Sequence, residues 1–171
     1  MNRNSLTLIS FIFFSAFLAC EGKDEPSEFD RKPILLNLSD SLIIPSYEAV
    51  IEKVNAFDAV MLKFKASPSQ ADLELLQEAW LNLALSWKTA EAFNFGPIQD
   101  LLIASTIDYI PVDTSSIIVA VAAYKGQQEY LLSQGSNKKG IAAIEYIVYE
   151  KAGDLLIKND NERYVAYLSL L

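Results

Sequence analysis

The chain contains no histidine and only one cysteine, Cys20, among its 171 residues. Without histidine it can form neither a serine–histidine–aspartate triad nor a cysteine–histidine pair, so the nucleophilic hydrolase sites that depend on an imidazole base are excluded. A lone cysteine also excludes an intramolecular disulfide. The free energy of folding must therefore come from packing.

Basic residues are scarce as well. The chain has 14 lysines and arginines against 22 acidic residues, and its net charge is −8. Nucleic-acid phosphates would be repelled by such a surface, which argues against a nucleic-acid partner. A glycine-rich phosphate loop is absent from the sequence. The acidity fits solubility or the attraction of cations.

The N-terminal segment has the composition of a secretory signal. Arg3 is followed by an apolar run, Leu6–Leu18, which is too short to span a bilayer. The tetrapeptide Phe17-Leu18-Ala19-Cys20 resembles a bacterial lipobox. We therefore expect residues 1–19 to be a lipoprotein signal peptide and Cys20 to be lipidated. The alternative is an ordinary signal peptide that happens to end near a cysteine.

The expected lipid would determine the location and the first partner. Acyl chains on Cys20 would anchor the protein to a membrane, which predicts a bacterial cell-envelope lipoprotein. We expect it at the outer membrane, on the periplasmic side or at the cell surface. Residues 20–33 are polar, contain two prolines and predict a flexible tether. No later stretch is expected to form a transmembrane helix.

From Ile34 onward the hydrophobic pattern is helical. Apolar residues recur at alternating spacings of three and four in two stretches, which predicts two amphipathic helices. The two stripes are Tyr47, Val50, Val54, Phe57, Met61 and Phe64, and Leu73, Leu76, Trp80, Leu83, Trp87 and Ala90. Ser69 and Asp72 predict an N-cap between them, and Gly96-Pro97 marks the end of the second helix. The pair predicts an antiparallel hairpin.

Two other segments allow alternatives. Leu35–Ile44 precedes Pro45 and is either a separate turn or joined to the first long helix through a kink. Ile117–Leu132 opens with β-branched residues, which allow a strand, whereas its alanines favour a helix. Gly140–Lys151 is again predicted to be helical. Residues 34–171 therefore predict one all-α domain, an up-down helical bundle.

Three separated segments carry recognisable motifs. Residues 79–97 form a tryptophan-rich helix ending in Glu-Ala-Phe-x-Phe-Gly-Pro, and residues 107–111 match Asp-Tyr-Trp-Pro with Ile110 for the tryptophan. Residues 139–146 match Gly-x-His-x-x-Glu, with Ala142 in the histidine's place. Their order and spacing resemble the imelysin-like family of bacterial envelope proteins.

The resemblance implies an all-α protein built from two helical bundles. Members of the family are longer, so residues 34–171 look like the first bundle alone, incomplete relative to the family. Members have been proposed as metallopeptidases and linked to iron uptake, with the histidine and glutamate of the signature as metal ligands. A second imelysin-like half, or another envelope protein, is then an expected partner.

The resemblance also identifies candidate site residues. Gly140, Gly96 and Pro97 are expected to preserve the scaffold. Ala142 and Glu145 lie at i and i+3 of the predicted helix, so a histidine at 142 would stand beside the carboxylate. Alanine offers no donor, and one carboxylate is not a metal site. The alternative for Glu145 is a structural carboxylate that caps a helix or pairs with a lysine.

Glu91 and Asp108 are the other candidate ligands. In the functional interpretation they gather with Glu145 in an acidic cleft that binds iron or another divalent or trivalent cation. In the structural interpretation Glu91 fixes the end of its helix, and Asp108 binds the backbone of its own turn. No catalytic residue is assigned.

Three hypotheses about function follow. The first is a lipid-anchored, non-catalytic binding or assembly module with a link to cation uptake. The second is a divergent metallopeptidase-like or cation-binding protein that uses Glu91, Asp108 and Glu145. The third is the truncated product of an interrupted gene.

Overall fold

The computed structural model describes residues 29–127, 129–152, 155, 161–169 and 171. Every regular element among these residues is helical, which confirms the all-α prediction. The chain divides into two compact units, Met1–Leu36 and Asn37–Leu171. The expected signal peptide, the lipidation site Cys20 and most of the expected tether lie outside the described residues.

The first long helix begins before the proline and continues through it. α2 (Lys32–Leu38) is followed by the π-helical turn η2 (Ser39–Ile43) and by α3 (Ile44–Ala66). The Ile44 backbone N–H donates to the Ser39 carbonyl, five residues earlier in the chain. The wider turn relieves the clash between the Pro45 ring and the preceding turn. The helical part thus starts at Lys32, two residues earlier than expected.

This continuity corrects one expectation about membranes. The helix Lys32–Ala66 is long and apolar enough to cross a bilayer by length and composition alone, with a mean hydropathy of 1.3 in its most apolar window. None of that window is buried. Such a segment was not expected after the N-terminal apolar run.

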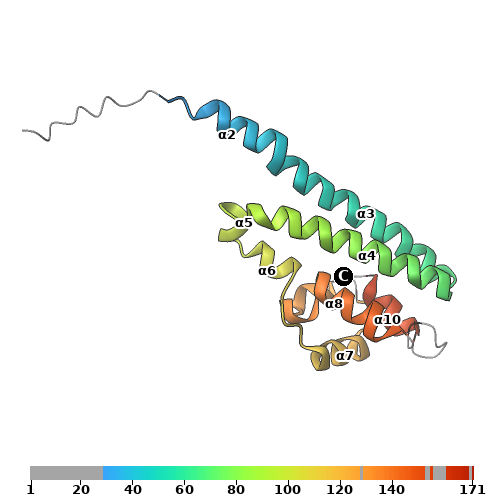
Figure 1. Ribbon diagram of the computed structural model, residues 1–171. Helices are drawn as coiled ribbons and strands as arrows, with labels where there is room; N and C mark the ends of the chain where they lie inside the picture. The colour runs from blue at the N-terminus through green and yellow to red at the C-terminus, as the bar shows by residue number, and fades with distance from the viewer. Residues whose placement is uncertain (1–28, 128, 153–154, 156–160, 170) are drawn as a thin grey trace, which may run out of the picture. The chain divides into compact units, whose positions relative to one another are not determined.

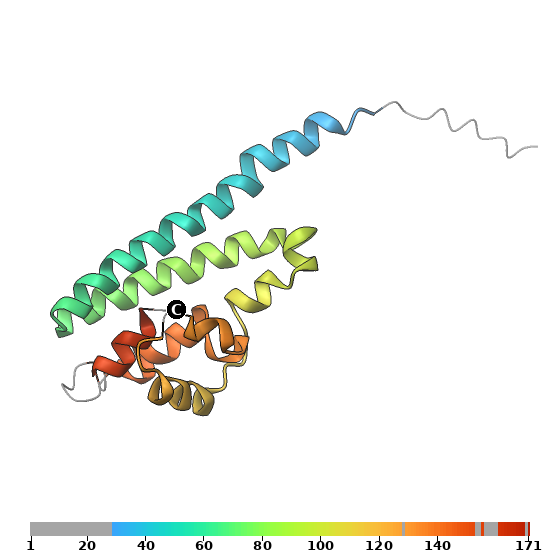
Figure 2. The ribbon, with the colours of Figure 1, turned by 180° about the vertical axis from the view of Figure 1, so that it is seen from behind.

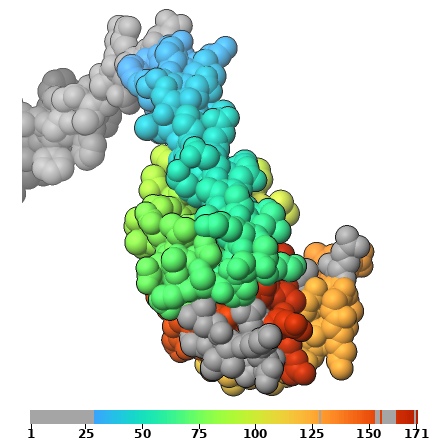
Figure 3. Space-filling view, turned by 90° about the vertical axis from the view of Figure 1, so that its right-hand side faces the viewer, coloured from blue at the N-terminus to red at the C-terminus, as the bar shows by residue number. Residues whose placement is uncertain are grey.

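α3 and α4 (Gln70–Ala90) form the predicted antiparallel hairpin (Figures 1 and 2). Ser69 caps α4, because its Oγ accepts the Asp72 backbone N–H at 3.1 Å. Lys63 reaches across to the Asp72 carboxylate at 2.6 Å. The space-filling view shows the two helices lying against each other (Figure 3).

The two predicted stripes supply the buried side of the hairpin. The stripe residues that are buried are Phe57, Met61, Phe64, Leu73, Leu76, Leu83, Trp87 and Ala90. Tyr47, Val50 and Trp80 are half-buried, and Val54 has 47% of its surface exposed. The N-terminal half of the α3 stripe is therefore less covered than its periodicity predicts.

The chain after α4 consists of short helices. These are η3 (Glu91–Phe93), α5 (Pro97–Asp100), α6 (Ile103–Ile107), α7 (Thr114–Ala123), η4 (Tyr130–Ser133), η5 (Ser136–Lys138), α8 (Ile141–Glu145), the π-helical η6 (Tyr146–Glu150) and α10 (Asn161–Leu168). The open choice at Ile117–Leu132 is settled as a helix up to Ala123, where α7 ends, and a 3-10 turn follows from Tyr130. Asp113 caps α7 by accepting the Ser116 N–H at 3.0 Å, which starts the helix before the β-branched residues.

α8 and η6 lie at the centre of the core. Ala143, Ile147 and Val148 have no exposed surface, and α4 packs directly against both elements. Tyr167 of α10 is also fully buried and donates its hydroxyl to the Lys138 carbonyl at 2.9 Å. Burial raises the pKa of Tyr167 to about 12. The signature segment is thus built into the hydrophobic core.

Candidate functional site

The three motif segments meet in the folded chain. Trp80 of α4 donates its indole N–H to the Ile141 carbonyl, at the start of α8, at 2.9 Å. Lys88, also on α4, forms an ion pair with Asp108 at 2.6 Å. The tryptophan-rich helix therefore contacts both of the other segments.

Gly140 joins the second segment to the third. Its φ is +82°, and a Cβ added there would lie 2.2 Å from the Ile107 carbonyl oxygen. Real Cβ atoms do not approach oxygen so closely, so only glycine allows this backbone contact. The Gly140 carbonyl then accepts the Ile144 N–H at 3.0 Å and starts α8. The glycine of the signature is a packing requirement.

Gly96 has a different reason to be glycine. Its φ is +59° with ψ −137°, and no atom would lie within 4 Å of an added Cβ. The backbone conformation alone therefore requires glycine. Pro97 follows at the start of α5, where a missing N–H is tolerated. Both predicted scaffold positions have a structural explanation.

Ala142 and Glu145 line one cleft of about 380 Å³, which we call the motif cleft. Its lining residues are Ile110, Pro111, Val112, Thr114, Ala142, Glu145, Tyr146, Tyr149 and Glu150. The expected i, i+3 relation therefore places both positions on the same face of α8. Ala142 is 8% exposed, and its methyl group offers no donor to the cleft. Glu145 is exposed.

Glu145 acts electrostatically on the wall of this cleft. Burial and then the Glu145 charge raise the pKa of Tyr149. The Tyr149 hydroxyl donates to the Gln77 carbonyl at 3.2 Å, and its ring packs edge-on against Trp80 at 5.2 Å. The cleft wall is thereby held to α4. The alternative in which Glu145 pairs with a lysine is not observed among the described residues.

Glu91 and Asp108 meet each other through a lysine. The Lys88 ammonium lies 3.0 Å from Glu91 and 2.6 Å from Asp108, whose side chain is only 4% exposed. Hydrogen bonds to Asp108 and then to Glu91 raise the pKa of Lys88. The Lys88 ammonium therefore binds both carboxylates, and through it Asp108 is bound to α4.

The structure does not bring the three candidate ligands together. Glu145 lines the motif cleft, whereas Glu91 and Asp108 belong to the Lys88 cluster. In the part of the chain that the structure describes, no three Asp, Glu, Cys or His side chains form a group suited to a metal ion. Lys88 was missed by the sequence reasoning, although its i, i+3 spacing to Glu91 was a usable signal.

The fold and the site define a class: a small helical domain with a Gly140-anchored helix and a cleft beside it. The family model described as Imelysin matches residues 43–171. The chain belongs to the imelysin family.

One curated relative is "Iron-regulated protein A" of Synechococcus elongatus. It is 26% identical over 110 residues, which cover 64% of this chain and 29% of the relative. The chain thus spans less than a third of that relative's length. No solved structure matches the chain significantly.

Proposed function

We propose that this imelysin-family protein is a non-catalytic binding or assembly module, anchored by lipid at Cys20 in the bacterial envelope. The observation that carries the proposal is Ala142 in the motif cleft. A transition-metal site needs several donors, and here a methyl group replaces the nitrogen donor of the signature. Since the chain has no histidine, it cannot supply an imidazole from elsewhere.

The surface of the hairpin supports an assembly role. Apolar side chains on the two long helices are exposed to solvent, namely Ile51, Leu62, Leu81 and Leu85. A second chain that packs on these side chains would remove them from water. We propose an envelope protein or a second imelysin-like half as the partner, and sedimentation velocity with a candidate protein measures the association.

Peptidase activity provides the direct test. Casein incubated with the protein and Zn²⁺ or Mn²⁺ should be hydrolysed no faster than without protein, and Glu145→Gln should behave identically. Metal-dependent hydrolysis that Glu145→Gln abolishes would show that the protein is an enzyme and refute the proposal.

A gain-of-function variant sharpens the test. Ala142→His places an imidazole beside Glu145 and should create Zn²⁺ binding that calorimetry detects. Ala142→Gln, of similar size but without the ring, is the matched control and should bind no more Zn²⁺ than the natural chain. If the natural chain binds Zn²⁺ as tightly as Ala142→His, the missing nitrogen is not decisive.

The iron link is a separate part of the proposal. The relative's name refers to regulation by iron, and we extend to this chain a role in the uptake of iron or another cation. A deletion strain should grow more slowly than its parent under iron limitation and recover with added iron. Equal growth of both strains would remove this part while leaving the binding module intact.

The lipid anchor can be distinguished from the apolar helix at Lys32–Ala66. Cys20→Ala should move the protein from the membrane to the soluble fraction, because the acyl chains provide the hold. If Cys20→Ala stays in the membrane, the lipid is not the anchor. Adding Leu42→Asp to that variant then tests the helix, since a charge in its apolar window should release the protein.

A further inference from the structure

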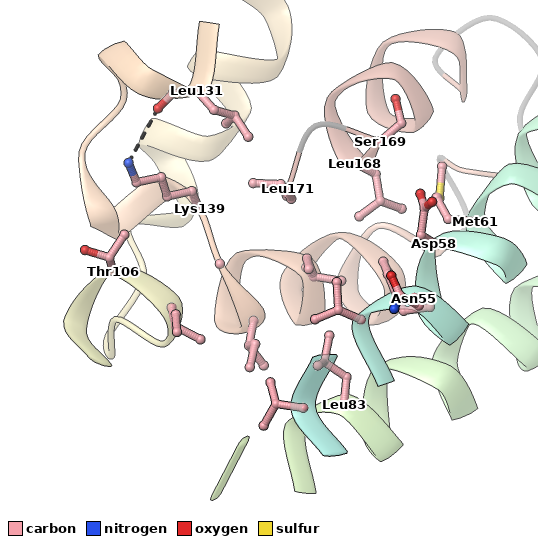
Figure 4. Close-up of a pocket in the computed structure, with 17 residues that line it drawn as sticks. Asn55, Asp58, Met61, Leu83, Thr106, Leu131, Lys139, Leu168, Ser169 and Leu171 are labelled. Atoms are coloured by element: carbon pink, nitrogen blue, oxygen red, sulfur yellow. Dashed lines mark hydrogen bonds between the residues drawn. The ribbon is translucent and has the colours of Figure 1, made fainter. Parts of the chain in front are cut away.

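A cavity of about 500 Å³ lies on another face of α8 (Figure 4). Ile141 and Ile144 line it, whereas Ala142 and Glu145, on the neighbouring face of the same helix, line the motif cleft. α3 and α4 contribute side chains such as Met61 and Leu83, and α6, η4 and α10 also line it. Its size lies within the range of pockets that hold small ligands, and it is separate from the site proposed above.

The walls of this cavity are mainly apolar. Met61, Leu83 and Ile144 are each less than 5% exposed, so these walls are fixed by core packing. Val54 also lines the cavity and remains 47% exposed. A ligand here would bury apolar surface at roughly 25 cal/mol per Å². The walls therefore suit an aliphatic body.

The polar groups stand at opposite ends. Lys139 and Thr106 lie at one end, and Asn55 and Asp58 of α3 lie at the other (Figure 4). Asp58 is exposed, so water can solvate its charge. Lys139 is half-buried and has less access to water.

Lys139 is poorly neutralised for its position. Its ammonium donates to the Leu131 carbonyl at 3.5 Å, beyond the usual range for a good hydrogen bond. Lys63 and Lys88, by contrast, each have a carboxylate at 2.6 Å. Among the described residues no carboxylate lies within ion-pair distance of Lys139. A half-buried ammonium without a counter-ion favours an anion.

We propose that this cavity binds an amphipathic carboxylate, with an aliphatic chain along the apolar walls and the carboxylate on Lys139. A single ammonium, with no arginine beside it, suits a monoanion better than a phosphate, which is bound by several donors. The net charge of −8 also disfavours a dianion. This inference is independent of the lipid at Cys20 and of the motif cleft.

Calorimetry of the purified full chain with laurate, below its micelle concentration and near pH 8, tests the ligand class. Laurate should bind saturably to one site. Dodecanol, with the same body and no charge, should bind at least tenfold more weakly, on the order expected for loss of a charged hydrogen bond. Dodecyltrimethylammonium should not saturate the site. No saturation with laurate, or equal binding of all three, would overturn the proposal.

Two pairs of variants test the location. Lys139→Gln should weaken laurate binding about tenfold, whereas Lys138→Gln, whose lysine contacts Gln134 and does not line the cavity, should leave it unchanged. Val54→Trp should block the cavity, whereas Ile51→Trp adds the same bulk elsewhere on α3. Thermal melts monitored by circular dichroism verify that each variant is folded. Equal effects within either pair, or loss of binding in Asp58→Asn alone, would contradict the assignment.

Discussion

α3 and α4 run for 23 and 21 residues, whereas no α-helix described between residues 97 and 171 exceeds 10. The two long helices are stabilised in part by their own hydrogen bonds and caps. The short helices after residue 97 are too short to be stable alone. The short helices depend on side chains from distant segments that reach their backbone carbonyls. Gln77, for example, donates to the Val148 carbonyl at 2.8 Å, across 71 positions of the chain.

The difference explains where the motif residues matter. Two of the three segments lie in the region of short helices, and the third is the part of α4 that contacts them. The residues that match the family therefore hold short elements in place. This scaffold is formed in a chain whose motif cleft is lined by the Ala142 methyl group.

Among the variants that test this comparison, Gly140→Ala should cause the largest loss of stability. The new methyl group would lie 2.2 Å from the Ile107 carbonyl oxygen in a backbone conformation that already strains alanine. We expect a loss of about 4 kcal/mol or more in the free energy of unfolding, measured by urea denaturation. Gly126→Ala is the control, because its φ is +88° but its surroundings are open, and it should lose only about 1 kcal/mol. Equal losses would mean that the close approach is unimportant.

Leu76→Ala tests the hairpin. Leu76 is fully buried, so its truncation should reduce the free energy of unfolding by about 3 kcal/mol through lost burial and a cavity. Leu85, on the same helix, is 59% exposed, and Leu85→Ala should change it by less than about 0.5 kcal/mol. Similar values for the two variants would show that the α3–α4 contact differs from the one described.

Asp108→Asn tests the link between the two regions. Loss of the nearly buried carboxylate should cost about 1–2 kcal/mol at neutral pH, a range reduced because Lys88 is half-exposed. Glu91→Gln, which removes the more exposed partner, should cost less.

The ion pair between Lys88 and Asp108 predicts that the free energy of unfolding depends on pH. The pKa of Lys88 is raised above its ordinary value of 10.5 in the folded state, so its contribution is complete below that value. It is lost as the pH rises through the folded-state pKa. The natural chain should therefore lose more stability than Asp108→Asn above pH 10.5, as followed by urea denaturation at several pH values. If the natural chain and Asp108→Asn lose the same stability above pH 10.5, the Lys88 ammonium is not stabilised by Asp108.

Ser69→Ala should have the smallest effect. It removes the acceptor for the Asp72 N–H at the start of α4 and should cost about 1 kcal/mol. Ser69→Thr keeps a hydroxyl that can accept from the Asp72 N–H and donate to the Asp72 carboxylate, and it should recover most of the loss in a thermal melt. A rescue failure would mean that the serine hydroxyl acts through another contact.

Local patterns predicted the hairpin well. Every buried residue of the two helices belongs to a stripe, although Tyr47, Val50 and Trp80 are only half-buried and Val54 is exposed. Ser69 was predicted as the cap. The same patterns left open whether Pro45 breaks the helix or only kinks it, and a π-turn allows the helix to continue there. Periodicity describes one helix at a time and contains no information about which helix covers a stripe.

The candidate site was less predictable. The spacing of Ala142 and Glu145 placed both correctly on one face of a helix. The gathering of Glu91 and Asp108 with Glu145 was not observed, because Lys88 holds the first two elsewhere. Whether separated carboxylates converge depends on the packing of elements far apart in the chain.

The sequence by itself determined the helical class, the two long helices and the absence of any imidazole. These properties follow from composition and from local spacing, since a helix forms hydrogen bonds within one segment. Only the tertiary structure decided why Gly140 must be glycine, that Lys88 joins Glu91 to Asp108, and that Lys139 faces an apolar cavity. The physical reason is that each depends on the approach of distant segments, and close packing sets that approach to within a fraction of an ångström.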